Sequence, residues 1–480
     1  MFRVKLIGII FLFFFCCEFS NSQPLTLYDS IEKALKYNET IMYAIQKNYL
    51  SAQSQLNLAE SAYRLQMNLN LNTTQNYSRT LSDDIYYTSW SQVTTPNLNF
   101  DYTLLTPLGS STHLGIGYQT QIFNSNSCYS SPQFDFTFQQ PLSWSGIQAG
   151  HADIIRARRN FVTSEMSYQL QNEGLIIAVI NSYFQLWQAF RSVEQSNYDL
   201  QSARRVLGIA ELRLKAGQLS EFEVMNIRVQ YQVAEDNLTV AQNSLQTEKR
   251  SFLRLLGQDL NTEIQLAAET QMDTVAFNLE YAIQTALQNR LEIKQQVTGL
   301  ELAGLSLKQI EAAAYPTLYL NGNYSLSSQY DVSLGSALWD YPNRYWRFQA
   351  SLSFPILDGG ARSNQVQIAK YVYNIQLKNL ELFKEDIAIA IEENFRSLQL
   401  NQNRIKSLTL SLKIAEEALN IAELRFKQGQ ISSTEIENIR QRFTNAQRSL
   451  NSAKISYITQ SAQLARAMAI LEEWVERQME

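Results

Sequence analysis

The stretch IAELRLKAGQLSEFEVMNIR at residues 209–228 occurs a second time, as IAELRFKQGQISSTEIENIR, at residues 421–440. Both copies place a glycine, Gly217 or Gly429, inside a pattern that is otherwise helical. Glycine costs a helix interior about 1 kcal/mol relative to alanine, so its presence at matched positions needs a reason. We interpret each glycine as a left-handed cap, where a long helix ends and the chain turns back along it.

The residues that follow each glycine predict the turn and the start of a returning helix. They are Gln218, Leu219 and Ser220 in the first copy, and Gln430, Ile431 and Ser432 in the second. Serine is a favoured N-cap residue, so Ser220 and Ser432 are expected to begin the returning helices. The copies then diverge, and the two tips are therefore expected to present different surfaces to a partner.

Sequence without proline precedes each glycine, from about residue 150 to 216 and from 361 to 428. At 1.5 Å per residue each predicted helix is about 100 Å long. After the glycines, apolar residues recur at alternating spacings of three and four, the pattern of a coiled-coil seam. These positions are Val224, Ile227, Tyr231, Ala234, Leu238, Ala241 and Leu245, and then Ile436, Ile439, Phe443, Ala446, Leu450, Ala453 and Tyr457.

The duplication divides the chain into two similar parts. The first repeat spans residues 23–256, with a helix at 26–66, strands within 67–140 and a helical hairpin at 150–256 whose tip is at 217. The second spans 279–470, with a helix at 279–314, strands within 316–355 and a hairpin at 359–470 whose tip is at 429. A linker at 257–278 and a C-terminal tail at 471–480 complete the division. We expect the helix at 279–314 to continue the line of the first returning helix, and the helix at 26–66 that of the second.

The N-terminus predicts export. Basic residues, an apolar run and small polar residues follow one another in MFRVKLIGIIFLFFFCCEFSNSQ, which is typical of a signal peptide at residues 1–22. Cys16 and Cys17 leave open a lipid anchor at the mature N-terminus, although bulky Phe15 favours cleavage after Ser22. No later run reaches the roughly 18 apolar residues of a transmembrane helix.

Between the short and the long helix of each repeat, the apolar period changes from 3.6 to 2. The stretches FDFTFQQP, YPTLYLNGNYSLSS and YWRFQASLSFP alternate in this way. A soluble sheet under a helix would alternate too, but the length and the aromatic residues favour barrel strands with one face in lipid. Four such strands cannot enclose a channel, since even eight leave an interior just filled by side chains, so several subunits are expected to share one barrel.

At this point the chain resembles the TolC-like outer membrane efflux proteins over nearly all of its mature length. The residues that carry the resemblance are AAAYPTLYLNGNYS at Ala312, LSFPILDGGARSNQVQIAK at Leu352, TFQQPLSWSGIQAG at Thr137 and the two glycine hairpins. The resemblance implies an α+β membrane protein: a homotrimer with a 12-stranded outer-membrane barrel, four strands per chain, on a long periplasmic α-helical barrel. It also implies the exit duct of a tripartite efflux or type I secretion system, in contact with a periplasmic adaptor and an inner-membrane transporter of the RND, ABC or a similar class.

Two features depart from the resemblance or extend it. Further alternating stretches at Asn97 and His113 predict an extra hairpin in the first repeat, which we expect to be an extension or loop elaboration because the resemblance implies four strands per chain. The expected junctions between strand and helix are Pro141, Pro316, Pro355, Gly359 and Gly360. Proline is excluded from helix interiors and central strands, and the glycines suit a turn.

The resemblance also suggests a gate. It places acidic side chains just past the hairpin tips at a constriction of the periplasmic mouth, where this sequence has Glu223 and Asn226, and Glu435 and Asn438. Three copies of Glu435 around one axis would favour cations, as carboxylate rings do in other pores. The alternative is that both glutamates are solvated charges on a helix surface.

Other functions find little support in the sequence. The net charge of −5 is scattered, so nucleic-acid binding through a basic surface is not expected. With His113 and His151 as the only histidines, and no metal-ligand spacing or phosphate-binding motif, we expect neither an enzyme nor a cofactor. A coiled-coil scaffold or adaptor without a pore stays the alternative, and detergent-free solubility would favour it.

Overall fold

The computed structural model describes residues 24–80, 89–106, 108–123, 127–267, 278–327, 330–331, 343–354 and 356–477. The predicted signal peptide with Cys16 and Cys17, and Pro355, lie outside these residues. The helices are α1 (Leu27–Tyr37), α2 (Glu39–Ser61), α3 (Trp144–Lys215), α4 (Glu221–Leu256), α5 (Leu279–Asn289), α6 (Leu291–Ala313), α8 (Ala361–Lys427), α9 (Ser433–Ala467) and α10 (Leu471–Arg477). The strands are β1 (Gln66–Thr80), β2 (Ser89–Leu105), β3 (Ser111–Phe123), β4 (Ser127–Pro141), β5 (Thr317–Ser327), β6 (Tyr330–Asp331) and β7 (Asn343–Ser353).

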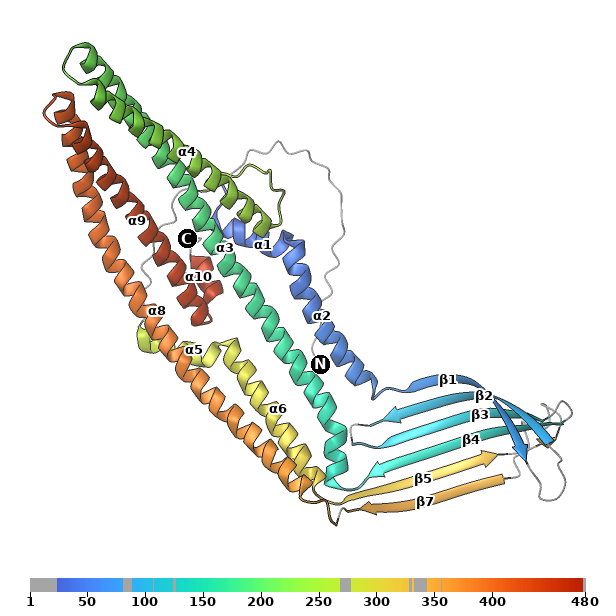
Figure 1. Ribbon diagram of the computed structural model, residues 1–480. Helices are drawn as coiled ribbons and strands as arrows, with labels where there is room; N and C mark the ends of the chain where they lie inside the picture. Colours follow the sequence, from blue (N-terminus) through green and yellow to red (C-terminus); the bar gives the residue numbers. More distant parts are fainter. Residues whose placement is uncertain are drawn as a thin grey trace.

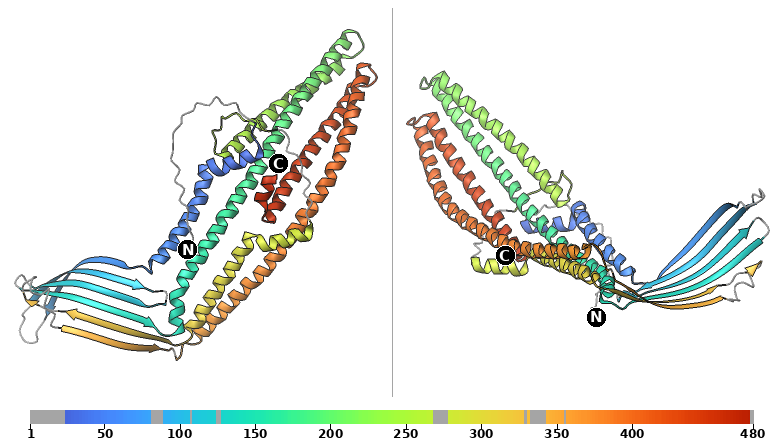
Figure 2. Two further views of the ribbon diagram at one scale, coloured as in Figure 1. Left: turned by 180° about the vertical axis from the view of Figure 1, so that it is seen from behind. Right: turned by 60° about the horizontal axis from the view of Figure 1, so that its bottom comes forward.

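The molecule is an elongated helical body with a sheet at one end. Both hairpin tips lie at the opposite end from the sheet, as Figures 1 and 2 show. Of the helices that the structure describes, none is long and apolar enough to cross a membrane.

Two long helices run the length of the body. The helix α3 has 72 residues and α8 has 67, about 108 and 100 Å at 1.5 Å per residue. The helix α3 begins at Trp144 with Ser143 as its N-cap, six residues before the predicted start, because the last strand of the first repeat ends directly before it at Pro141.

The shorter helices stack along the long ones, but in the opposite pairing from the one we expected. The helix α4 returns along α3 and is continued there by α1 and α2, whereas α9 returns along α8 and is continued by α5 and α6 (Figure 1). The end of α4 packs against the α1–α2 boundary: the Nδ2 of buried Asn38 donates to the carbonyl of Leu255 at 2.7 Å. Gly257 caps α4 with a φ of +70°, and a Cβ there would lie 2.6 Å from the carbonyl oxygen of Tyr37.

Each predicted short helix is interrupted once. The breaks fall at Asn38 and at Arg290, which occupy the same position in the related stretches ALKYNETI and ALQNRLEI. The side chain of Asn38 accepts a hydrogen bond from Ile41 N at 3.0 Å and so begins α2, whereas Arg290 pairs with Glu292 and makes no cap of this kind. Duplication has therefore kept the break while changing the chemistry that holds it.

The predicted C-terminal tail is in part a structural element. Residues 471–477 form α10, and Leu471, Trp474 and Val475 are buried in the core cluster that also holds Leu25 and Phe252. The segment belongs to the packed middle of the helical body, because its apolar face covers the junction where the first short helix meets α3.

In the described part of the chain, six strands lie side by side in the order β1-β2-β3-β4-β5-β7, all antiparallel, with the short β6 also pairing with β4. We call this path the main sheet. We expected the hairpin β2–β3 to be an extension or loop elaboration; the loop alternative is wrong, because the hairpin pairs along its length with β1 on one side and β4 on the other.

Candidate functional site

The first hairpin tip closes α3 through a backbone motif that requires glycine. Gly217 has a φ of +70°, its N–H donates to the carbonyl of Leu214 at 2.9 Å, and that of Gln218 donates to the carbonyl of Arg213 at 2.9 Å. This pair of hydrogen bonds is the Schellman motif, which satisfies carbonyls at the end of a helix. A Cβ at Gly217 would meet no atom within 4 Å, so only the backbone conformation demands glycine here.

The second tip repeats the motif and adds a contact. Gly429 has a φ of +74°, and the N–H groups of Gly429 and Gln430 donate to the carbonyls of Phe426 and Arg425. The guanidinium of Arg213, from the first hairpin, occupies the place where a Cβ at Gly429 would stand, and it lies 5.9 Å from the centroid of the Phe426 ring. The backbone conformation of Gly429 therefore requires glycine, and a side chain there would also have to displace the end of the flexible Arg213 side chain.

The two returning helices begin differently. Ser220 accepts from Glu223 N at 3.2 Å, and the Glu223 carboxylate accepts in turn from the N–H of Ser220 at 3.0 Å, which completes a capping box. Hydrogen bonds from Ser220 hold the pKa of the Glu223 carboxyl below its ordinary value. The bond from the backbone N–H has the larger effect and the bond from the hydroxyl the smaller. Ser432 accepts from Glu435 N at 3.2 Å, but the described hydrogen bonds of Glu435 include no return contact of its carboxylate.

The predicted gate residues are therefore unequal. All four are exposed near the tips, namely Glu223, Asn226, Glu435 and Asn438, but only the Glu223 carboxylate is turned back onto the start of its own helix. Leu219 and Ile431 pack against an apolar cluster that joins the hairpins, whose buried members are Val206, Ala210, Val224, Ile227, Ala422, Phe426 and Ile436. Gln218, Ser220, Gln430 and Ser432 are exposed. The structure thus brings the two tips together around a small apolar contact.

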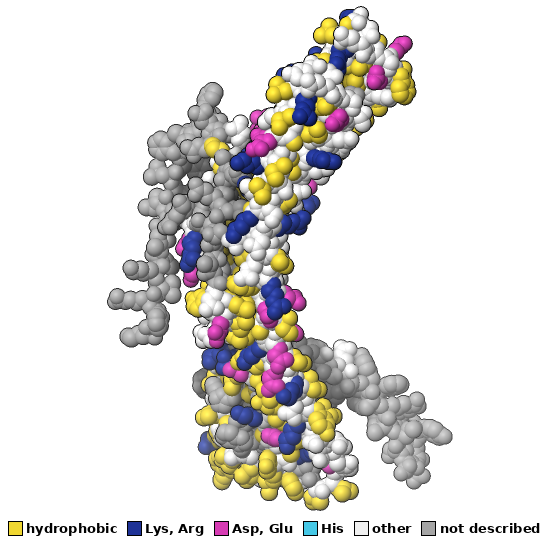
Figure 3. Space-filling model, turned by 90° about the vertical axis from the view of Figure 1, so that its left-hand side faces the viewer, with side chains coloured by type: hydrophobic (Ala, Val, Ile, Leu, Met, Phe, Trp, Pro, Cys, Tyr) yellow, Lys and Arg dark blue, Asp and Glu magenta, His cyan; other side chains and the backbone are white. Residues whose placement is uncertain are grey.

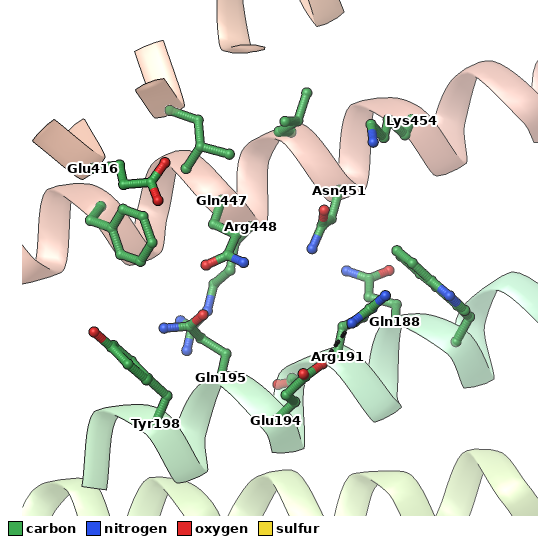
Figure 4. Close-up of a pocket in the computed structure, with 15 residues that line it drawn as sticks. Gln188, Arg191, Glu194, Gln195, Tyr198, Glu416, Gln447, Arg448, Asn451 and Lys454 are labelled. Carbon is green, nitrogen blue, oxygen red and sulfur yellow. Dashed lines mark hydrogen bonds and ion pairs between the residues drawn. The ribbon is translucent and has the colours of Figure 1, made fainter. Parts of the chain in front are cut away.

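Further from the tips, polar side chains join the apolar ones in the contact between the hairpins. A groove of about 670 Å³ lies between α3 and α9, with part of α8 at its side. Figure 4 shows Arg191, Glu194 and Gln195 of α3 facing Gln447 and Asn451 of α9 across this groove. Polar and apolar side chains line this groove in similar measure, so the hairpins pack less tightly here than at the apolar cluster near the tips.

A second polar space, closer to the tips, contains charged groups that the sequence did not single out. Arg440 is 4% exposed and donates to Glu437 at 2.7 Å, and among the described residues nothing accepts from its Nε or Nη2. Asp199 of α3 accepts from Gln195 at 3.0 Å and from Thr444 of α9 at 3.4 Å. Burial raises the pKa of Asp199, although these donors and nearby arginines oppose the shift.

The sequence held one signal for the missed contact at the tips. Arg213 and Arg425 occupy matched positions in the repeated motif, so an arginine beside each tip could have been suspected. The relative orientation of the two hairpins decides which arginine reaches the other hairpin. No local sequence pattern specifies that orientation.

The junctions between sheet and helices lie together at the base of the body. Pro141 ends β4, and Pro316 stands between α6 and β5. Gly359 and Gly360 have φ values of +63° and +83°, and the Asp358 carboxylate accepts from the N–H of Gly360 at 2.9 Å as α8 begins. These turns couple the direction of the strands to that of the long helices.

The main sheet has one apolar and one polar face. Because directly paired residues of antiparallel strands point to the same side, the register defines rows across all six described strands. One row is Met67, Tyr102, Leu114, Phe136, Tyr324 and Trp346, and another is Gln66, Thr103, His113, Thr137, Asn323 and Arg347.

No other part of the described chain covers the apolar face at the edges of the sheet. Met67 is 65% exposed and Trp346 is 69% exposed. Figure 3 shows hydrophobic side chains gathered at the end of the molecule away from the tips, with charged ones spread along the helical body. Uncovered apolar surface of this extent indicates contact with lipid or with protein.

The polar face carries a chain of contacts across the first three strands. Asn70 of β1 donates to Asp101 of β2 at 2.8 Å, and His113 Nε2 of β3 lies 3.3 Å from the same carboxylate. A Cβ at Gly117 would lie 2.6 Å from the amide oxygen of Asn99, so glycine makes room on this face for the neighbouring side chain.

An uncovered amphipathic sheet joined to two long helical hairpins is the architecture of the outer-membrane channel class. Residues 282–469 match the family described as Outer membrane efflux protein. The chain is 21% identical to the outer membrane protein TolC of Escherichia coli over 361 residues, which are 73% of this chain and 71% of that one.

Solved structures agree with the family match. The outer membrane protein VceC of Vibrio cholerae superposes with a TM-score of 0.69 at 17% identity, covering 92% of this chain and 95% of the other. The CmeC outer membrane channel of Campylobacter jejuni gives 0.67 at 15% identity, covering 94% and 89%. The chain thus matches the Outer membrane efflux protein family over residues 282–469, and it is similar to TolC in sequence and to VceC in fold over most of its length. It is an outer-membrane exit duct of an efflux system, with a large periplasmic part.

Proposed function

We propose that three copies of this chain assemble around one axis into a closed duct, a homotrimer whose main sheets form the wall in outer-membrane lipid. The exposed apolar face of the sheet carries this proposal. The polar groups at an open sheet edge cannot remain unpaired in lipid, so the free edges β1 and β7 need partner strands. Each chain contributes an equal share of the helical wall below.

The exposed hairpin tips are the surface that we assign to the periplasmic adaptor. Gly217 and Gly429 with their following residues lie at the end of the molecule opposite the sheet, which is the end that faces the inner membrane in such an orientation. An inner-membrane transporter of the RND, ABC or a similar class would deliver the substrate through this adaptor. The two tips differ in sequence and capping, so the adaptor would meet two distinct surfaces.

The same end forms the gate in this proposal. The apolar cluster between the hairpins and the contact of Arg213 with Gly429 hold the tips of one chain together. Opening would separate or shift the hairpins along the groove between α3 and α9, where fewer apolar contacts resist movement. Exposed Glu435, repeated three times around the axis, would favour cations at the mouth.

Membrane fractionation and native mass spectrometry test the proposal. The full-length chain is expressed with its N-terminal segment in a bacterium with two membranes, and the outer membrane is separated on a density gradient. We expect the chain in the outer membrane as a detergent-extracted trimer that retains a co-expressed adaptor. A monomer that is soluble without detergent would instead support the scaffold alternative, which leaves the uncovered apolar face unexplained.

A further inference from the structure

The hairpin β2–β3 is an integral part of the sheet and not an addition to its rim. It continues both the apolar rows and the polar rows without a change of face, as the pairing of Tyr102 with Met67 and with Leu114 shows. A loop elaboration in water would have no reason to keep an apolar side in register with that of its neighbours.

Contacts on the polar face fix the hairpin to the first strand. Asp101 of β2 is held by Asn70 of β1 and faces His113 of β3, so one carboxylate joins three consecutive strands. The hairpin therefore has the same fixed place in the wall as the strands on either side.

We infer that the trimer closes as an 18-stranded barrel, six strands from each chain, in which the hairpin β2–β3 widens the wall to match the helical duct beneath it. This inference rests on the trimeric duct proposed above and concerns the width of its outer-membrane part. An even number of antiparallel strands per chain sets β7 of one copy antiparallel to β1 of the next, so the polar and apolar faces continue across each junction.

The widths of the two parts of one chain support this strand number. In the described residues, four helical columns stand side by side: α3, α8, α4 with α1–α2, and α9 with α5–α6. At about 8–10 Å between axes, they span about 32–40 Å of circumference.

Strands lie about 4.8 Å apart and tilt by about 35–45° in barrels, so six of them span about 35–41 Å and four only about 23–27 Å. With the hairpin in the wall, the sheet and the helices of one chain cover equal arcs. The lumen then keeps its width from the helical duct through the membrane. A substrate that fits the helical duct therefore also fits the barrel.

Cysteine labelling in the full-length, membrane-embedded protein tests whether the hairpin is in the wall. In a Cys128→Ser background, Ile116→Cys reports the apolar face of β3 and Gln119→Cys its polar face. Leu71→Cys on β1 and Phe348→Cys on β7 are matched apolar-face controls. The probe is a water-soluble maleimide, applied before and after the membrane is dissolved in detergent.

We expect Ile116→Cys to be protected to the same extent as the two controls, and Gln119→Cys to react. Labelling of Ile116→Cys while Leu71→Cys and Phe348→Cys stay protected would place the hairpin outside the wall and overturn the inference. Labelling at all three would overturn the membrane duct itself, and this inference with it.

Deletion of residues 89–126 tests the width. Removal of two strands preserves the alternation of faces and returns each chain to four strands in the described path. Neutral polymers added from the outer side of a planar bilayer should enter the wild-type mouth at a size that the deletion variant excludes. Equal exclusion sizes from two trimeric channels would contradict an 18-stranded wall. Cryo-electron microscopy of the wild-type trimer counts the strands directly, and a count of 12 would also overturn it.

Discussion

The guanidinium of Arg213, at the tip of the first hairpin, lies against Gly429, at the tip of the second. It occupies the space that a side chain at Gly429 would need. The matched Gly217 has open space around it. Two glycines of common origin thus share one backbone motif, but only Gly429 is also part of a contact between the hairpins. Comparison of the two substitutions separates these roles.

Gly217→Ala and Gly429→Ala should differ in their effect on the closed gate. Each places alanine in a left-handed conformation, which costs about 1–2 kcal/mol. Gly429→Ala must also displace Arg213 from the Phe426 ring, so we expect it to raise the conductance of the closed channel in a planar bilayer, whereas Gly217→Ala should not. The double variant Arg213→Ala/Gly429→Ala should be no less stable than Gly429→Ala, because the clash is gone. Equal closed-state conductance of the two alanine variants would contradict a contact role for Gly429.

Glu435→Gln should weaken the cation preference of the channel. Its carboxylate is exposed near the tip, and three copies around one axis would act together. Glu223→Gln is the matched control, because that carboxylate is engaged by Ser220 and begins α4. Reversal potentials under a salt gradient measure the preference. Selectivity that survives Glu435→Gln, or falls equally in both variants, would count against a special role for Glu435 at the mouth.

Asp199→Asn should stabilise the protein at neutral pH. Burial raises the pKa of Asp199 in the folded state, so between its unfolded and folded pKa values the folded chain binds more protons than the unfolded one. The wild type therefore gains stability as pH falls through this range, while the asparagine variant, which resembles the protonated form, gains none from this site.

Thermal unfolding at several pH values checks the prediction for Asp199. The Tm of the variant should exceed that of the wild type at pH 7, and the difference should shrink as pH falls towards the ordinary range of an aspartate. A difference independent of pH would show that hydrogen bonding with Gln195 and Thr444, and not the buried charge, governs this site.

Asn38→Ala should destabilise the helical body by about 2–3 kcal/mol, because the change removes an N-cap and leaves a partly buried carbonyl without its donor. The side chain of Asn38 is 2% exposed, accepts from Ile41 N and donates to Leu255 O. Arg290→Ala at the matched break is the control and should cost less, since Arg290 provides no side-chain cap. Chemical denaturation followed by helical circular dichroism measures both; an equal loss would mean that the break itself, and not the Asn38 contacts, sets the stability.

Local signals predicted the elements of this fold well. The glycine tips, the Ser220 and Ser432 starts, the coiled-coil seam and the alternating strands depend on residues close together in the chain, so their periods and caps are visible in the sequence. The break at Asn38 was missed because nothing in the helical pattern marks it. Its partner Leu255 lies more than two hundred residues away and supplies the reason for it.

Long-range packing decided what the sequence left open. By itself the sequence determined that two long hairpins and an amphipathic sheet exist, because glycine conformation and side-chain period are local properties. Only the tertiary structure decided that α1–α2 continue α4, that the hairpin β2–β3 lies within the sheet, and that Arg213 crosses to Gly429. In each case several surfaces of the chain are equally apolar or equally extended, so local pattern does not decide which of them meet. Complementary shape and strand register between distant segments decide it.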